Sequence, residues 1–302
     1  SLFLVPKFVP AADGTLVRND VHAVSLEHKM GIRASPTCVL ALGDAEGARG
    51  WLVGRLHEGL ACMFTMMNHM RLGVGLHSTG LAERACQLAL SHARERLQGR
   101  DARGEQRPII EHADVRRMLL TMRALTHAAR CLAYTAAAAI DVAHGAPDEA
   151  VRAAAERRAS LLTPVVKAWC SETAVEVASL GVQVHGGAGF IDDAEISQVY
   201  RDARIGPIFE GTNYIQAQDL LGRKIVRDGG RELEALITEM EAAAQALSAE
   251  EHALARLRDG LLDGCARLRA AATELVSRAA KDTELVGATA YHFLHWLGVL
   301  AG

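Results

Sequence analysis

The sequence predicts a mainly α protein, in which a partial β-domain is followed by a helical bundle and an extra helical extension. Half of the 302 residues are hydrophobic, but only 4% are aromatic. Alanine and leucine therefore supply most of the apolar mass, and both favour helices. From residue 58 onward apolar residues recur at helical spacing, whereas before it short apolar runs alternate with turn residues.

Residues 1–56 are predicted to form part of a middle β-domain. Pairs such as Asp13-Gly14 and Gly43-Asp44 separate its short apolar runs. A few strands do not form a stable sheet alone, so we expect partner strands from other sequence or another chain. The expected strands are Leu2–Val5, Val21–Leu26, Thr37–Leu42 and Trp51–Val53.

Residues 57–228 are predicted to form the helical bundle, and residues 229–302 the extension, with Asp228-Gly229-Gly230 between them. Polar or glycine-rich stretches at 99–106 and 181–189 predict loops. Pro164 predicts a kink. The expected helices cover 58–99, 108–144, 148–180, a short stretch from 194, 212–225, and two or three further segments in 231–302.

Composition excludes several classes of function. The 33 basic and 36 acidic residues are well mixed and leave a net charge of -3, which argues against a nucleic-acid partner. No apolar run reaches the roughly 18 residues that span a bilayer. The six cysteines have no metal-ligand spacing, which predicts reduced, buried thiols in a cytoplasmic protein. The chain lacks an initiator methionine and ends in an apolar helical pattern, so we expect it to be cut from a longer protein.

The strongest chemical signal is one acid, Glu210, which stands between the hydrophobic triplet Pro207–Phe209 and the pair Gly211-Thr212. An apolar setting raises the pKa of a carboxylate and suits it to take a proton from a weak carbon acid. The alternative reading is an ordinary acid near a helix start, where the helix dipole favours glutamate.

Several motifs together resemble the C-terminal half of an acyl-CoA dehydrogenase over residues 1 to 225. The resemblance implies an acyl-CoA-dehydrogenase-type four-helix bundle, FAD as cofactor, and α,β-dehydrogenation of an acyl-CoA thioester. E-R-L-Q-G-R and the extension after residue 229 resemble the long branch of the family, which includes 3-(methylthio)propionyl-CoA dehydrogenase. The motifs are F-L-V-P-K, L-E-H-K-M-G-I-R-A-S-P-T, N-H-M-R-L-G-V-G, E-R-L-Q-G-R, Q-V-H-G-G-A-G-F, R-D-A-R-I and F-E-G-T-N.

The resemblance implies roles for residues around the substrate. Glu210 would remove the α-proton while the β-hydrogen leaves as hydride to the flavin. Gly211 and Thr212 would contact the flavin, although Thr212 also suits a helix N-cap. Asn68 and Arg71 would bind the CoA portion of the substrate. The family often has an acid where Asn68 stands, and this chain departs from it there.

The resemblance also implies FAD contacts across a subunit interface. Gln183, Gly186 and Gly187 would receive the adenosine part of a neighbour's FAD. Arg96 and Gln98 would face the pyrophosphate, for which the planar fork of arginine is suited. A shared site implies a homodimer or a dimer of dimers. The likeness further implies electron-transfer flavoprotein as the electron acceptor.

Two other functions stay open at this stage. A DNA-binding flavoprotein of the alkylation-response type would need a basic surface on the extension, whereas residues 229–302 are net acidic. An acyl-CoA oxidase differs in oxygen access to the flavin, which the sequence does not separate. The acyl chain is also undetermined. We expect residues 1–302 alone to bind FAD weakly or not at all, because much of the flavin-facing β-domain is missing.

Overall fold

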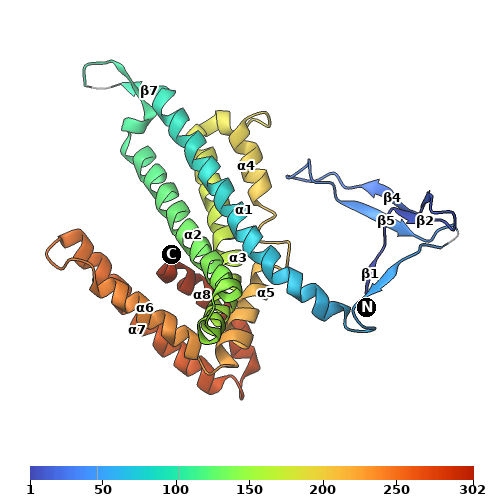
Figure 1. Ribbon diagram of the computed structural model, residues 1–302. Coiled ribbons are helices and arrows are strands. Elements are labelled where there is room, and N and C mark those ends of the chain that lie inside the picture. The colour runs from blue at the N-terminus through green and yellow to red at the C-terminus, as the bar shows by residue number, and fades with distance from the viewer. Residues whose placement is uncertain (46, 101) are drawn as a thin grey trace. The chain divides into compact units, whose positions relative to one another are not determined.

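A computed structural model describes residues 1–45, 47–100 and 102–302. It contains two compact units, Ser1–Met70 and Arg71–Gly302. Long helices dominate the second unit and short strands the first, which confirms the predicted mainly α class (Figure 1). The predicted three-part division at residues 56 and 228 stays a prediction.

The first unit consists of antiparallel strand pairs followed by the start of a helix. Apolar side chains such as Leu16 and Leu26 are 70% and 64% exposed, in keeping with the prediction that these strands need further partners. The sequence prediction missed the second pair, whose strands have three residues each. The pairs are β1 (Leu2–Leu4) with β6 (Trp51–Val53), β2 (Phe8–Pro10) with β3 (Leu16–Arg18), and β4 (Val21–Leu26) with β5 (Cys38–Leu42).

Three long helices form the first half of the second unit. Helix α1 (Gly59–Glu95) enters from the first unit, and α2 (Ala113–Gly145) and α3 (Glu149–His185) lie side by side (Figure 1). The strands β7 (Leu97–Arg100) and β8 (Gln106–Pro108) form a hairpin where the prediction had a polar loop, and residue 101 of that loop lies outside the described residues.

Two glycines inside these helices allow close helix packing. A Cβ on Gly75 of α1 would lie 2.3 Å from a methyl carbon of Val166 on α3. A Cβ on Gly181 of α3 would lie 2.6 Å from Ile196, at the start of α4 (Glu195–Ala203). The predicted loop at 181–189 is therefore wrong in its first part: α3 continues to His185, because Gly181 allows α4 to pack closely.

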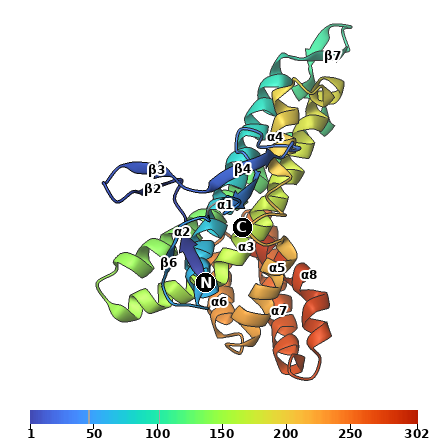
Figure 2. The ribbon, with the colours of Figure 1, turned by 90° about the vertical axis from the view of Figure 1, so that its right-hand side faces the viewer.

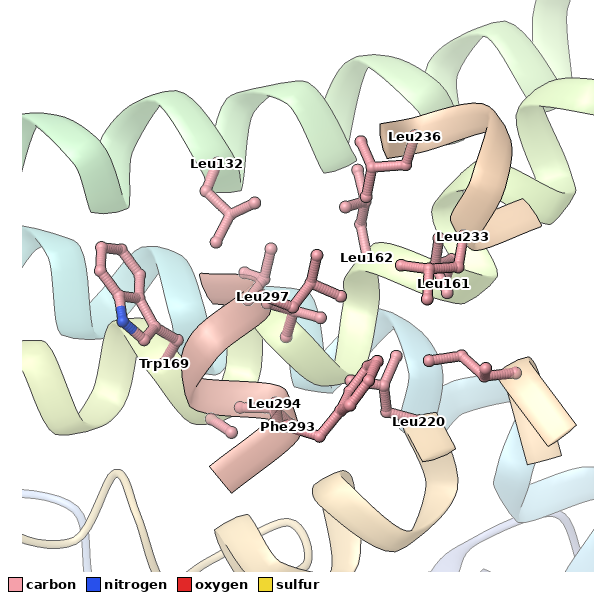
Figure 3. Packing of buried hydrophobic residues seen from close by; sticks show 14 of the residues in the cluster. Leu132, Leu161, Leu162, Trp169, Leu220, Leu233, Leu236, Phe293, Leu294 and Leu297 are labelled. Carbon is pink, nitrogen blue, oxygen red and sulfur yellow. The ribbon is translucent and has the colours of Figure 1, made fainter. Parts of the chain in front are cut away.

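The extension shares one hydrophobic core with the bundle. After α5 (Asn213–Gln218) comes a π-helical segment, Asp219–Val226, and then α6 (Arg231–Gln245), α7 (His252–Arg278) and α8 (Thr283–Ala301). Helices α6 and α7 pack against each other, and α8 packs on α3 and α5 (Figure 1, Figure 2). Figure 3 shows leucines from α2, α3 and α6 meeting Phe293, Leu294 and Leu297 of α8.

Two other predictions can be compared with the structure. Cys38 and Cys131 are exposed, so the prediction of uniformly buried thiols is wrong; Cys38 begins a strand with open apolar faces, and Cys131 lies on an outer face of α2. No helix in the described part of the chain is long and apolar enough to cross a membrane.

Candidate active site

Glu210 lies in a sharp turn between α4 and α5. Its φ is 57°, in the left-handed region, and Gly211 follows with a φ of 85°. Left-handed backbone is uncommon for a residue with a side chain and is found disproportionately at functional sites. Gly211 meets two demands here, because a Cβ on it would also lie 2.9 Å from the Gln216 side-chain nitrogen.

Hydrogen bonds to backbone carbonyls hold this turn. Lys167 Nζ donates to the carbonyl oxygen of Gly211 over 2.7 Å. The Gln216 side-chain nitrogen donates to the carbonyls of Glu210, at 3.3 Å, and Gly211, at 3.2 Å. The amide of Asn213 closes the turn by donating to the Pro207 carbonyl over 3.1 Å. The carbonyls of Glu210 and Gly211 are thus occupied by contacts within the protein.

The side chains of the turn are left available. Among the described residues, the carboxylate of Glu210 accepts no hydrogen bond and forms no ion pair. Glu210 is partly exposed, and Ile208 in the preceding triplet is 48% exposed. Thr212 occupies the N-cap position of α5, yet its side chain makes no capping hydrogen bond. Both groups can therefore face a ligand.

Lys167 is a buried cation that contacts the turn through the Gly211 carbonyl. It stands in the apolar middle of α3, is 0% exposed, and also donates to Asn213 Oδ1 over 2.9 Å. Burial and the charge of Arg71 lower its pKa to about 8, against the opposing charges of Glu172 and Glu210.

This low pKa predicts a pH-dependent effect of Lys167→Met. At pH 7 we expect a loss of about 1–3 kcal/mol in unfolding free energy, because the Gly211 carbonyl and Asn213 Oδ1 lose a donor. Between about pH 8 and 10.5 the unfolded lysine binds a proton that the folded one has lost, so the wild type gains stability as pH rises. The gap between wild type and variant should therefore widen over this range. Urea unfolding at pH 7, 8.5 and 10 measures it, and a constant gap would contradict the assignment.

Arg71, a predicted CoA contact, is buried in the structure. Its side chain is 7% exposed and pairs with the carboxylate of Asp219, which is 10% exposed, over 3.4 Å. The Nε atom of Arg71 is buried without a hydrogen-bond partner in the described structure. Asn68 stands three residues earlier on the same helix and is exposed. Their role at CoA stays a prediction.

The other five predicted cofactor residues line a single pocket. Arg96 and Gln98, just after α1, and Gln183, Gly186 and Gly187, at the end of α3, surround a cavity of about 630 Å³. Gly186 ends α3 with a φ of 61°, and a Cβ on either glycine would meet open space. The fold therefore brings together residues that are nearly 90 positions apart in the chain.

Histidines complete this pocket. The rings of His92 and His185 stack with centroids 4.3 Å apart. Burial lowers the pKa of His92, and the charges of His185 and Arg96 act in the same direction. The Nε2 atom of His112 lies 2.9 Å from the carbonyl oxygen of Gln98 and so contacts strand β7 of the hairpin. The pocket thus combines one guanidinium, ring nitrogens and open glycine backbone, which together suit an anionic ligand.

The family follows from comparison with known proteins. Residues 57–225 match the model of the acyl-CoA dehydrogenase C-terminal domain. This chain belongs to the acyl-CoA dehydrogenase family. The match ends at residue 225, before α6, so it leaves the extension outside.

Curated relatives agree with this assignment. The whole chain is 47% identical to 3-methylmercaptopropionyl-CoA dehydrogenase of Ruegeria pomeroyi over 305 residues and covers 51% of that protein. It is also 39% identical over 246 residues to the broad-specificity linear acyl-CoA dehydrogenase FadE5 of Mycobacterium tuberculosis, covering 76% of this chain and 39% of the relative. The chain thus spans about half the length, or less, of these two relatives.

Solved structures share the fold. An acyl-CoA dehydrogenase from Bacillus anthracis, complexed with FAD, matches 95% of this chain and 50% of its own with a TM-score of 0.76 and 24% identity. ACDH-11 of Caenorhabditis elegans, in complex with C11-CoA, matches 97% of this chain and 50% of its own with a TM-score of 0.77 and 20% identity. At these identities the likeness supports the fold alone.

Sequence reasoning missed the groups that support the Glu210 turn. Lys167, Glu172 and Asn213 contact one another or the turn, but none of them was singled out as a site residue. A lysine inside the apolar run from Leu161 to Trp169 was a usable signal, because such a residue is seldom buried without a partner. No local signal pointed to Glu172.

Proposed function

We propose that the intact protein dehydrogenates an acyl-CoA thioester between its α and β carbons, with FAD as cofactor and Glu210 as the base that takes the α-proton. The main supporting observation is that the carboxylate of Glu210 has no protein partner among the described residues. It lies in a turn with left-handed backbone, whose carbonyls accept hydrogen bonds from Lys167 and Gln216. A general base must be free to reach the proton that it removes.

The geometry gives each part of the turn a task. Fixing the carbonyls of Glu210 and Gly211 restricts where the carboxylate can point, which reduces the entropic cost of alignment with the α-carbon. The partial exposure of Glu210 leaves room for a substrate next to it. Thr212, two residues away, has a hydroxyl that makes no capping hydrogen bond.

The residues present fit FAD. When bound, FAD supplies the acceptor for the hydride that leaves the β-carbon. Gly211 and Thr212 would hold it beside the base. The Arg96 pocket suits a diphosphate, because a guanidinium forms paired hydrogen bonds to phosphate oxygens and Gly186 lets backbone approach closely. We assign that pocket to the FAD of a second subunit, which implies a homodimer or a dimer of dimers. We also propose electron-transfer flavoprotein as the acceptor, on the strength of the family resemblance alone.

Anaerobic titration of the natural-length protein tests the function. We expect FAD to copurify and its yellow colour to bleach on addition of an acyl-CoA from a panel that contains 3-(methylthio)propionyl-CoA and straight-chain thioesters of four, eight and sixteen carbons. The preferred member reports the substrate class. A flavin-loaded protein that none of these thioesters bleaches would overturn the proposal.

A DNA-binding role is the poorer alternative. Four arginines of the extension pair with acids of the same extension, so they form no free basic face. These pairs are Arg258–Asp259, Arg267–Asp263, Arg269–Glu234 and Arg278–Glu274. An oxidase activity would be recognised by hydrogen peroxide formed from an acyl-CoA in air.

A further inference from the structure

We propose that α8 of the extension positions the Glu210 turn, and that Glu172 is the positioning residue through which it acts. This goes beyond the family domain, because residues 283–301 lie outside the matched region 57–225. The expected effect on turnover rests on the proposed role of Glu210. The positioning of the turn by α8 rests on side-chain contacts alone.

Glu172 joins three elements with one carboxylate. It lies on α3, one turn after Ala168. Its Oε1 atom accepts a hydrogen bond from the side-chain nitrogen of Asn213 over 2.8 Å. Its Oε2 atom accepts from the Tyr291 hydroxyl over 2.7 Å and lies 2.5 Å from His295 Nε2. Tyr291 and His295 are one helical turn apart on α8, so both face the same carboxylate.

Asn213 connects this carboxylate to the turn. It follows Glu210 by three residues, is 4% exposed, and starts α5. Its Oδ1 atom accepts from Lys167, and its side-chain nitrogen also donates to the Ala168 carbonyl over 3.1 Å. Because both the oxygen and the nitrogen of the Asn213 side chain are hydrogen-bonded, the turn that precedes Asn213 has little conformational freedom.

The charge of Glu172 is stabilised by this arrangement. Burial opposes its ionisation, but the close contact with His295 and the hydrogen bonds from Asn213 and Tyr291 outweigh burial and keep its pKa below the usual value. Conversely, burial and the bond to Glu172 raise the pKa of Tyr291 to about 12. An ionised acceptor forms the stronger class of hydrogen bond, which suits a fixed support.

A second contact joins α8 to the same segment. The hydroxyl of Tyr214 donates to the carbonyl of Gly287 over 3.1 Å and accepts from the Gln218 side chain over 3.2 Å. A Cβ on Gly287 would lie 3.2 Å from that hydroxyl, so glycine leaves it room. Helix α8 therefore touches the residue next to Asn213 directly and Asn213 itself through Glu172.

The decisive variant removes both α8 side chains that contact Glu172 and leaves its hydrogen bond with Asn213. In the natural-length protein, Tyr291→Phe/His295→Leu should make backbone amides of residues 205–216 exchange with deuterium about tenfold faster. The turnover number should fall about tenfold while KM changes less than about twofold, because alignment and not binding is lost. Glu284→Gln, at an exposed position on the same helix two turns before Tyr291, is the control and should change neither quantity.

The outcomes separate the two proposals. Local exchange that matches wild type in the double variant would overturn the positioning role, as would faster exchange spread evenly over the protein. Hydrogen exchange can be measured without catalysis. If local exchange is faster in the variant but the wild-type protein has no acyl-CoA activity, the positioning role of α8 is confirmed and the proposed function is rejected. If the double variant does not fold, Tyr291→Phe keeps the ring and should raise local exchange about threefold.

Discussion

Glu210→Gln is expected to slow anaerobic flavin bleaching by acyl-CoA about a thousandfold in the natural-length protein. The carboxamide has nearly the shape of the carboxylate, so the left-handed turn and its bonds to Lys167 and Gln216 should survive. It cannot accept the α-proton, however, and no other acid follows within the turn. Stopped-flow absorbance at the flavin band measures the rate.

Binding and chemistry separate in this experiment. FAD content and acyl-CoA affinity should stay within about twofold of wild type, because the substitution preserves packing. Glu176→Gln is the matched control: it removes the same charge from an exposed position on α3 and should leave the rate unchanged. Bleaching by Glu210→Gln at the wild-type rate would mean that another group takes the proton.

Asp219→Ala should cost about 3–5 kcal/mol in unfolding free energy, because it leaves the Arg71 guanidinium buried without its counter-charge. Arg223 also faces Asp219, at 3.6 Å, but its side chain is 69% exposed and can turn to solvent. Chemical denaturation of residues 1–302 measures the loss. Asp219 is the first residue of the π-helical segment that follows α5, so the loss of stability should extend toward the Glu210 turn.

A surface pair serves as the control for this prediction. Asp263→Ala breaks the pair between Asp263 and Arg267, whose side chains are 60% and 70% exposed, and should cost less than about 1 kcal/mol. Equal losses for the two alanine variants would show that the Arg71–Asp219 pair is no more important than a surface pair. Replacing both buried partners by Arg71→Met and Asp219→Leu should recover much of the lost stability.

Part of this fold could be predicted from local pattern. Apolar periodicity located the long helices, and all four predicted strands stand where expected. The hairpin β7–β8 was missed because its residues are polar and its pairing depends on a chain reversal. The end of α3 was misplaced because Gly181 has the appearance of a helix breaker, yet serves contact with Ile196.

The candidate site divides in the same way. Contiguous motifs predicted Glu210, Gly211 and Thr212 together, and the structure places them in one turn. The five residues that line the Arg96 pocket were predicted in two separate motifs, and only the fold brings the ends of α1 and α3 together around one cavity.

The sequence by itself determined the family, the helical class and the acid that can act as base, because those depend on periodicity and on short motifs. Only the tertiary structure decided how that acid is held. Glu172 and Tyr291 are 119 residues apart in the chain, and no local preference indicates that a tyrosine in an apolar helix will meet a particular carboxylate. Such a contact depends on the packing of α8 against α3, in which Gly298 allows the Trp169 ring to come close. Support for the proposed base is therefore a property of the assembled core, whereas the candidate acid itself could be found in the motif.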